Sequence, residues 1–346
     1  MSKRPYEPDA ARVVDNIPNI NKLFGKRIFI TGGTGMICSA VADILFFLNQ
    51  MQHADIKVIF AGRNRASLEA KFQGDDWSFV TFDATKPYQT AMNVDYVIYG
   101  ASNADPSAIA TSPVETIMAN TSGLIDVFNN VNSSRYLYIS SSEIYGNGSK
   151  APYEEHDYGY VDILNPRACY PTSKRLAENT CIAFADEYQK DVVIVRPGHI
   201  YGPTISERDS RASAQFSRMA ADHDDIVMKS AGTQLRSYCY VYDCASAILA
   251  VLLNGENRNA YNISNRDSIV TIREMAESLA RAGGSRVIFE EASDAEKKSY
   301  NLMDNSSLRS DKLEALGWRA AFDINSGARR TVEVLRDRRN TSKANK

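Results

Sequence analysis

The sequence lacks an excess charge of either sign, long apolar runs and paired cysteines. Its 40 Lys and Arg residues face 42 Asp and Glu residues, a formal net charge of -2, which argues against a nucleic-acid partner or an anionic membrane surface. The basic tail, residues 336–346, has no aromatic residues and is expected to be a solvated end. Apolar runs such as Ile44–Leu48 are far shorter than the roughly 20 residues of a membrane helix, so no membrane partner is expected.

The five cysteines give no sign of metal or disulfide chemistry. They form no CxxC pair and lie at no metal-ligating spacing from a histidine. Because their number is odd and the N-terminus shows no signal-peptide pattern, we expect reduced thiols, a cytoplasmic protein and no metal site.

From residue 26 onward, short β-rich runs alternate with amphipathic helical segments. This alternation is typical of an α/β fold built as a Rossmann-type doubly wound parallel sheet. We expect an N-terminal arm (1–25), a dinucleotide-binding domain (26–200), a smaller C-terminal substrate-binding lobe (201–335) and the basic tail (336–346), with a helix at 242–253 returning to the first domain. The expected strands are 27–31, 57–61, 78–83, 96–101, 136–140 and 192–196, and the expected helices are 36–50, 65–72, 113–131, 167–188, 242–253, 271–281 and 310–316.

The first expected strand runs into a glycine turn, Gly32-Gly33-Thr34-Gly35, and then into a helix that starts at Met36 and Ile37. Glycines let the backbone approach a pyrophosphate, which then sits at the positive end of the helix. We therefore assign Gly32, Gly35, Met36 and Ile37 to cofactor binding, with a purely structural turn as the alternative. Cys38 stands where a third glycine usually packs helix against strand, which predicts a slight spreading of the two.

The turn after the second expected strand carries Arg63 and Arg65 but no carboxylate. NAD sites usually place Asp or Glu there for the ribose, whereas an Arg accommodates the 2′-phosphate of NADP. The cofactor is thus expected to be NAD or NADP, with NADP favoured. Asp83 is placed to meet the adenine amino group or is an ordinary turn residue, and Ala101 completes the expected cofactor contacts.

Tyr170 and Lys174 lie four positions apart, which places them on one face of a helix, one turn from each other. An ammonium so close to a phenol favours the phenolate and lowers the tyrosine pKa. A phenolate is a usable general base near neutral pH, so the pair predicts alcohol oxidation.

The chain resembles the extended short-chain dehydrogenase/reductases, and more narrowly the NAD-dependent epimerase/dehydratase family of nucleotide-sugar enzymes, over about residues 26–335. The resemblance rests on the glycine turn, Asp83, Ser140–Gly146 (SSSEIYG), Tyr170 with Lys174, Arg196–Pro203 (RPGHIYGP), Arg236–Asp243 (RSYCYVYD) and Leu316-Gly317-Trp318. It implies a nucleotide-diphosphate sugar as substrate and transient oxidation of its carbon 4. Tyr170 would take the hydroxyl proton, Lys174 would hold the nicotinamide ribose, and Ser141 would hydrogen-bond the same hydroxyl.

The catalytic candidates are Ser141, Ser142, Glu143, Tyr170 and Lys174. The Ser142-Glu143 pair resembles UDP-glucuronate decarboxylases and GDP-mannose 4,6-dehydratases, whereas dTDP-glucose 4,6-dehydratases typically carry Asp-Glu and simple 4-epimerases need no Glu there. A strand-end carboxylate that caps a loop is the alternative for Glu143. A 4-epimerase, a non-catalytic dinucleotide-binding sensor and a dehydrogenase that releases reduced cofactor remain alternative functions.

Five residues are expected to bind the substrate: His199, Arg211, Gln215, Arg236 and Asp243. His199 occupies a position where the family has an Asn that touches the sugar nucleotide, and it would contact a phosphate or sugar hydroxyl or be a core histidine. The planar fork of Arg236 suits a diphosphate, with a surface salt bridge as the alternative. Arg211 and Gln215 lie where the family closes on the nucleotide, or they belong to an ordinary helix start. The family also implies a homodimer through the helices near 113–131 and 167–188.

Overall fold

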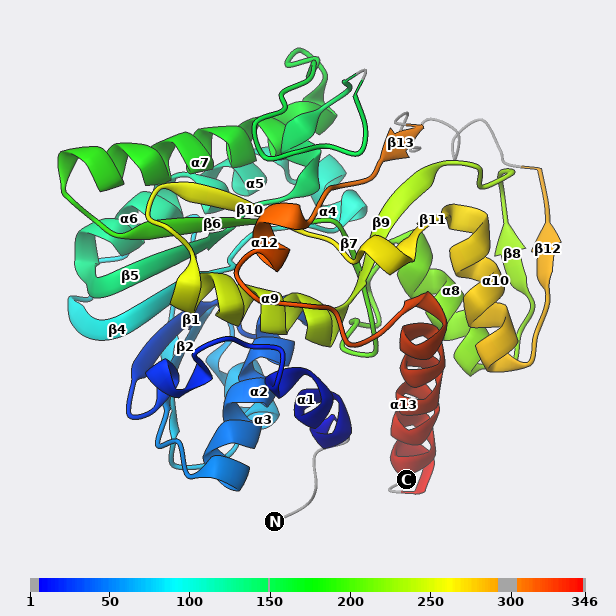
Figure 1. The fold of residues 1–346 in the computed structure, drawn as a ribbon, viewed down its shortest axis with the longest axis horizontal. Helices are drawn as coiled ribbons and strands as arrows, with labels where there is room; N and C mark the ends of the chain where they lie inside the picture. Colours follow the sequence, from blue (N-terminus) through cyan, green and yellow to red (C-terminus); the bar gives the residue numbers. More distant parts are fainter. Residues whose placement is uncertain (1–5, 149, 292–303, 345–346) are drawn as a thin grey trace.

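The computed structural model describes residues 6–148, 150–291 and 304–344. Its centre is a seven-stranded sheet in the order β10-β6-β5-β4-β1-β2-β3 (Figure 1). All neighbouring strands are parallel, which confirms the doubly wound α/β prediction. The strands are β1 (Arg27–Thr31), β2 (Lys57–Gly62), β3 (Trp77–Thr81), β4 (Met92–Tyr99), β5 (Val131–Ile139), β6 (Val192–Pro197) and β10 (Asn259–Ile263).

Helices cover both faces of this sheet (Figure 1). In β1, Ile28 and Ile30 point to one hydrophobic layer and Phe29 to the other, as the period of two in a strand requires. The expected helix 113–131 is in fact two helices that part at Thr121. One face carries α2 (Met36–Gln52), α3 (Arg65–Lys71) and α9 (Val241–Asn254), and the other carries α5 (Pro113–Asn120), α6 (Ser122–Asn130) and α7 (Cys169–Glu187).

The chain returns to the sheet after the second lobe has begun. Helix α9 packs against α2, as expected for residues 242–253. Strand β10 then pairs with β6, a seventh strand that the sequence pattern did not predict. The second lobe therefore consists of segments on both sides of α9 and β10.

In the described part of the chain, the second lobe packs helices beside two small sheets (Figure 1). Strand β9 is its central element, because β7, β11 and β13 all pair with it. The strands are β7 (His199–Tyr201), β8 (Ile226–Met228), β9 (Leu235–Tyr240), β11 (Ile269–Thr271), β12 (Val287–Phe289) and β13 (Asn305–Ser306). The helices are α8 (Ala212–Ala221), α10 (Ile272–Gly283), the short α12 (Asp311–Glu314) and α13 (Ile324–Ala344).

Helices lie near both ends of the described chain. The N-terminal arm contains α1 (Glu7–Val14), which packs against α2 and α9 and buries Val13 completely. Helix α13 continues through the described part of the basic tail to Ala344, and Asp337, Arg338, Asn340 and Thr341 are exposed there. Arg336 donates to the carbonyl of Ala220 at 3.0 Å, so it satisfies an acceptor in the last turn of α8.

In the described ranges, no helix has both the length and the apolar character needed to cross a bilayer. All five cysteines are free thiols, and four of them are buried.

Candidate active site

The residues with candidate chemistry lie just beyond the carboxyl ends of the parallel strands. Gly32 follows β1, Ala101 follows β4, Ser141 follows β5 and His199 follows β6. Because β6, β5, β4 and β1 are consecutive in the sheet, these residues share one edge. This is the edge at which open α/β sheets bind ligands.

The glycine turn is packed too closely for side chains. Gly32 has a φ of +72°, and a Cβ there would lie 2.6 Å from the carbonyl oxygen of Gly100. A Cβ on Gly33 would lie 2.7 Å from the Phe60 ring, so Gly33, which the motif reasoning passes over, is required as well. The turn opens α2 at Met36, whose first N–H groups have no acceptor within the helix. These features fit the pyrophosphate of a dinucleotide.

Cys38 packs against Gly100, which directly follows the neighbouring strand β4. Its thiol donates to the carbonyl of Thr31 at 3.5 Å. A Cβ on Gly100 would lie 2.4 Å from the Cys38 sulfur, so the missing side chain at Gly100 makes room for the thiol. The hydroxyl of Thr31 accepts the N–H groups of Gly100 and Ala101, each at 3.0 Å, and this joins the ends of β1 and β4.

Tyr170 and Lys174 lie in the first turns of α7, and both are buried. Lys174 Nζ donates to the carbonyl of Ile139 at 2.7 Å and lies 5.8 Å from the centre of the Tyr170 ring. Burial raises the pKa of Tyr170 to about 12, the charge of Glu143 adds to this, and a hydrogen bond with Ser141 opposes it. Burial lowers the pKa of Lys174 to about 7. The expected lowering of the tyrosine pKa is therefore wrong for this structure, because desolvation outweighs the nearby cations.

Glu143 is held at the site by two contacts. Its backbone N–H donates to Ser141 Oγ at 3.2 Å, and its carboxylate accepts from Arg167 Nη2 at 2.9 Å. Ser142 lies between them, buried at the start of a short 3-10 helix, Ser142–Tyr145. No role is predicted for Arg167 from the sequence, although its place three residues before Tyr170 puts it near that residue on the chain.

The charges of Arg211 and Arg236 both act on His199, so the three side chains lie near one another. Burial, followed by the charges of Arg236 and Arg211, lowers the pKa of His199 to about 3, so its ring is neutral. Among the described residues, the buried Nδ1 of His199 has no hydrogen-bond partner. Arg236 is 2% exposed, and burial lowers its pKa. A buried ring nitrogen without a partner, near two guanidinium groups, favours a role for His199 in binding a phosphate or a sugar hydroxyl over a purely structural role in the core.

Two of the expected substrate residues point elsewhere. Asp243 is fully buried, and its oxygens accept the N–H groups of Ala321 at 2.7 Å and Phe322 at 3.0 Å. The predicted substrate contact of Asp243 is therefore wrong, because its carboxylate fastens the segment before α13 to α9. Gln215 is exposed on α8 and donates to the carbonyl of Ser210 at 2.6 Å.

The adenine end of the predicted cofactor site is formed by turns. Asp83 accepts the N–H of Thr85 at 3.1 Å and its hydroxyl at 2.8 Å, as a turn residue does. The pKa of Asp83 is lowered, because its hydrogen bonds from Thr85 and the charges of Lys86 and Arg63 outweigh the opposing effect of burial. Arg63 is exposed at the end of β2. The adenine contact of Asp83 stays a prediction.

A buried ion pair lies behind Lys174. Glu178, one helical turn further along α7, accepts from Arg196 Nη2 at 2.6 Å and from Arg196 Nε at 3.0 Å. Its other contact is the hydroxyl of Ser140, which donates at 2.5 Å. The pair joins α7 to β6. Burial lowers the pKa of Lys174, and the negative charge of Glu178 opposes this effect without outweighing it. No local pattern in the sequence predicts this ion pair.

A glycine turn at a helix start and a Tyr–Lys–Ser group at the carboxyl edge of a parallel sheet define a dinucleotide-dependent enzyme of the short-chain dehydrogenase/reductase type. The chain matches the NAD dependent epimerase/dehydratase family over residues 28–264, and it belongs to that family.

Relatives with known activities support the same grouping. The chain is 28% identical over 318 residues to UDP-glucuronic acid decarboxylase 1 of Xenopus tropicalis, covering 90% of this chain and 72% of the relative. It is 29% identical over 259 residues to UDP-glucuronic acid decarboxylase 6 of Arabidopsis thaliana, covering 73% of each.

Solved structures share the fold. An epimerase from Methanothermobacter thermautotrophicus superposes with a TM-score of 0.78 at 19% identity, covering 99% of each chain. The dTDP-glucose 4,6-dehydratase of Bacillus anthracis, in complex with NAD, superposes with a TM-score of 0.72 at 17% identity, covering 93% of this chain and 100% of that one.

Proposed function

We propose that this protein oxidises a nucleotide-diphosphate sugar at carbon 4 and then decarboxylates it, with UDP-glucuronate as the favoured substrate. Sugar 4,6-dehydration is the second candidate reaction. The observation that carries the proposal is the meeting of Ser141, Glu143 and Tyr170 at the end of β5: Ser141 hydrogen-bonds both the Tyr170 hydroxyl and the Glu143 N–H. Similarity to UDP-glucuronic acid decarboxylases supports the choice of reaction.

The glycine turn and the first turn of α2 would hold the cofactor pyrophosphate, and Lys174 would hold the nicotinamide ribose. When bound there, the dinucleotide would supply a reversible acceptor for the hydride of carbon 4. NADP is our preferred form, because the exposed Arg63 suits a 2′-phosphate. Arg63→Ala should weaken NADP binding and leave NAD binding nearly unchanged in calorimetry. Equal weakening of both would contradict this preference.

Tyr170 is the base for the proton of the carbon 4 hydroxyl. Its oxygen accepts the hydroxyl proton as the carbon is oxidised, and Ser141 hydrogen-bonds the same oxygen. Burial keeps the phenol protonated, but a base must be ionised. The reaction therefore requires nearby cations that favour the phenolate. Arg167 and Arg211 act in that direction, since their charges lower the pKa of Tyr170.

A ketone at carbon 4 weakens the bond to a carboxylate on carbon 5. When the C5–C6 bond breaks, carbon dioxide leaves and the electron pair moves to the carbon 4 oxygen as an enolate. Tyr170, now protonated, and Ser141 can donate to that oxygen and stabilise its charge. Decarboxylation removes no proton from carbon 5, whereas 4,6-dehydration does. In the dehydration, Glu143 is the candidate base for that proton.

The test incubates purified protein with NAD or NADP and a panel of nucleotide sugars, followed by mass spectrometry. Loss of carbon dioxide indicates decarboxylation, loss of water indicates dehydration, and a new isomer of unchanged mass indicates 4-epimerisation. Tyr170→Phe is the matched control, which should cut turnover by roughly 10²- to 10⁴-fold without altering the fold. If no sugar is converted, the proposal fails, and dinucleotide binding without conversion would favour a sensor.

We further propose a homodimer formed through α5 and α7. Three apolar side chains support it, because Val114 is 65%, Ile117 41% and Leu176 53% exposed on these two helices. Sedimentation should give a dimer, and Ile117→Asp with Leu176→Asp should give a folded monomer. A monomeric wild-type protein would contradict the proposal.

A further inference from the structure

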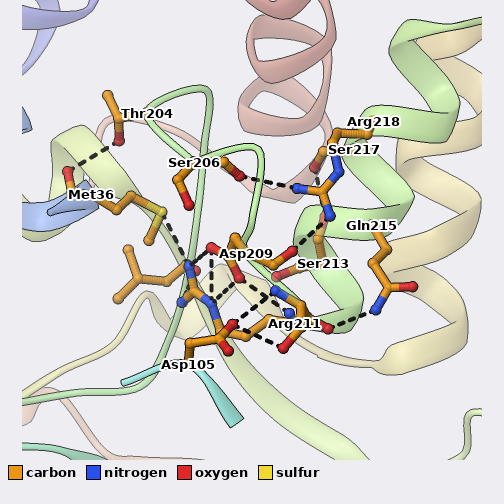
Figure 2. Close-up of polar contacts among 12 residues, drawn as sticks. Met36, Asp105, Thr204, Ser206, Asp209, Arg211, Ser213, Gln215, Ser217 and Arg218 are labelled. Carbon is orange, nitrogen blue, oxygen red and sulfur yellow. Dashed lines mark hydrogen bonds and ion pairs between the residues drawn. The ribbon is translucent and has the colours of Figure 1, made fainter. Parts of the chain in front are cut away.

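Residues 204–211 connect β7 to α8 and contact the first residue of α2. The hydroxyl of Thr204 donates to the Met36 carbonyl at 3.1 Å, and Nη2 of Arg211 contacts the Met36 sulfur at 3.4 Å (Figure 2). Met36 directly follows the glycine turn. This segment of the second lobe therefore lies against the part of the first domain that fits a pyrophosphate.

The same segment is attached to a second loop of the first domain. Asp105 Oδ2 accepts the N–H and the hydroxyl of Ser210, both at 2.8 Å. Its other oxygen accepts the N–H groups of Ser107 and Ala108 at 3.0 and 3.2 Å and caps α4 (Pro106–Thr111). One carboxylate thus holds the start of α4 and the neighbour of Arg211 at the same time.

The two attachment points border the predicted cofactor site. Met36 follows β1, Asp105 follows β4, and these strands are neighbours in the sheet. A segment fixed to both loops crosses the carboxyl edge of the sheet between them. A dinucleotide whose pyrophosphate lies at the start of α2 would therefore lie next to this segment.

The segment is also braced by an internal ion pair and by hydrogen bonds to β7 and α8. Arg211 pairs with Asp209 at 2.5 Å, and its Nη1 donates to the carbonyl of Ile200 at 3.3 Å. Arg218 of α8 donates to the carbonyls of Ser206 at 3.2 Å and Asp209 at 2.6 Å (Figure 2). Opening would therefore break the contacts to Met36 and Asp105 rather than those inside the segment.

We propose that residues 204–211 form a strap over the cofactor, and that Asp105 is the positioning residue that keeps the strap closed. The inference rests on the dinucleotide-dependent function proposed above. Asp105 holds Ser210, which places Arg211 at the start of α2. The Met36 thioether is a weak acceptor. Arg211 can therefore exchange this hydrogen bond for one to a phosphate oxygen at little cost. The closed strap slows dissociation of the dinucleotide.

The experiment measures how fast bound NADH leaves the full-length protein, with no sugar present. NADH-loaded protein is mixed with excess NAD, and the nicotinamide fluorescence is followed by stopped flow. Asp105→Ala should release NADH roughly tenfold faster or more, since it removes two hydrogen bonds to a charged acceptor. Ser210→Ala keeps the backbone donor and should give a smaller acceleration.

A matched variant separates the strap from the helix cap. Asp105→Ser can still cap α4, because serine caps helices about as well as aspartate, but it lacks the second oxygen for Ser210. It should release NADH as fast as Asp105→Ala does. In the Asp105→Ala background, Ser210→Ala should have no further effect. Thermal unfolding of the NADH-free variants shows whether the fold is kept.

The strap would be overturned if Asp105→Ser released NADH at the wild-type rate. It would also be overturned if the effects of Asp105→Ala and Ser210→Ala on the release rate were additive. A wild-type protein that binds neither NADH nor NADPH would overturn it too, and if only NADPH binds, the same release measurements are made with NADPH and NADP. Unchanged release rates alongside sugar conversion reject the strap and leave the proposed reaction in place. Faster release without conversion of any sugar rejects the reaction and leaves the strap.

Discussion

Arg167 donates to Glu143 at 2.9 Å and neutralises its charge beside the Tyr170 hydroxyl. The ion pair joins the loop after β5 to the 3-10 helix that precedes α7. The two side chains act on Tyr170 in opposite directions, because the charge of Glu143 raises its pKa and that of Arg167 lowers it. Under the proposed function, a sugar carboxylate arrives near this pair.

Arg167→Gln should therefore weaken binding of a carboxylate-bearing sugar selectively. With Glu143 uncompensated, like-charge repulsion should raise the KM for UDP-glucuronate by roughly tenfold. UDP-glucose carries no sugar carboxylate, so its inhibition constant should change little. The double variant Arg167→Gln with Glu143→Gln should return the KM toward the wild-type value. Equal weakening of both ligands would contradict the electrostatic explanation.

Glu143→Gln distinguishes the two candidate reactions. A decarboxylase removes no proton from carbon 5, so it should keep carbon dioxide release within about tenfold of wild type. A 4,6-dehydratase would lose its base and roughly 10²- to 10⁴-fold of its rate. Product mass and rate are read in one assay, and a large loss of carbon dioxide release would contradict the decarboxylation mechanism drawn here.

The sheet and the core of the site could be predicted because their signals are local. The strand, glycine turn and helix start around Gly32 are contiguous, and Tyr170 and Lys174 share one helix. What the sequence could not show depends on pairing across the chain. Arg167 meets Glu143 across 24 positions, and β10 joins the sheet beside β6 only in the folded chain.

Burial explains the two wrong assignments at the site. The spacing of Tyr170 and Lys174 suggested a lowered tyrosine pKa, but desolvation is a property of the complete fold and dominates here. Asp243 ends the Arg236–Asp243 motif, which suggested a substrate contact. Its carboxylate instead accepts a hydrogen bond from the backbone N–H of Ala321, much later in the chain. Neither effect has a local sequence signal.

The buried pair of Glu178 and Arg196 should be costly to break and much cheaper to replace. Glu178→Gln leaves the Arg196 guanidinium, which is 2% exposed, without its carboxylate. We expect a loss of about 3–5 kcal/mol in the free energy of unfolding. Glu178→Leu with Arg196→Met should recover much of this loss in urea unfolding. A double variant as unstable as the single one would indicate that the hydrogen bonds to Ser140 and Tyr145 matter more.

Asp243 should make stability depend on pH. Burial raises its pKa to about 7 from an ordinary value of 3.8, against the two backbone hydrogen bonds that favour the ionised form. The folded protein then binds a proton that the unfolded chain has lost. This contribution is fully present below about pH 4 and is lost as the pH rises through about 7, to a total of about 4 kcal/mol.

Asp243→Asn cannot titrate, so it isolates this contribution. Wild type should be more stable relative to the variant at about pH 5 than at about pH 8, when both are unfolded in urea. A constant difference between the two proteins across this range would show that Asp243 keeps its charge in the folded state.

Gly100→Ala tests whether Cys38 depends on the missing side chain beside it. The new Cβ would lie 2.4 Å from the Cys38 sulfur and 3.2 Å from the Thr31 carbonyl, so the thiol is the tighter clash. Overpacking of this kind should cost about 1–3 kcal/mol in the free energy of unfolding. Cys38→Ala removes the sulfur and creates the space, so the double variant should be markedly more stable than Gly100→Ala alone in thermal or urea unfolding. If the double variant recovers nothing, the contact with the Thr31 backbone, and not the thiol, requires glycine at position 100.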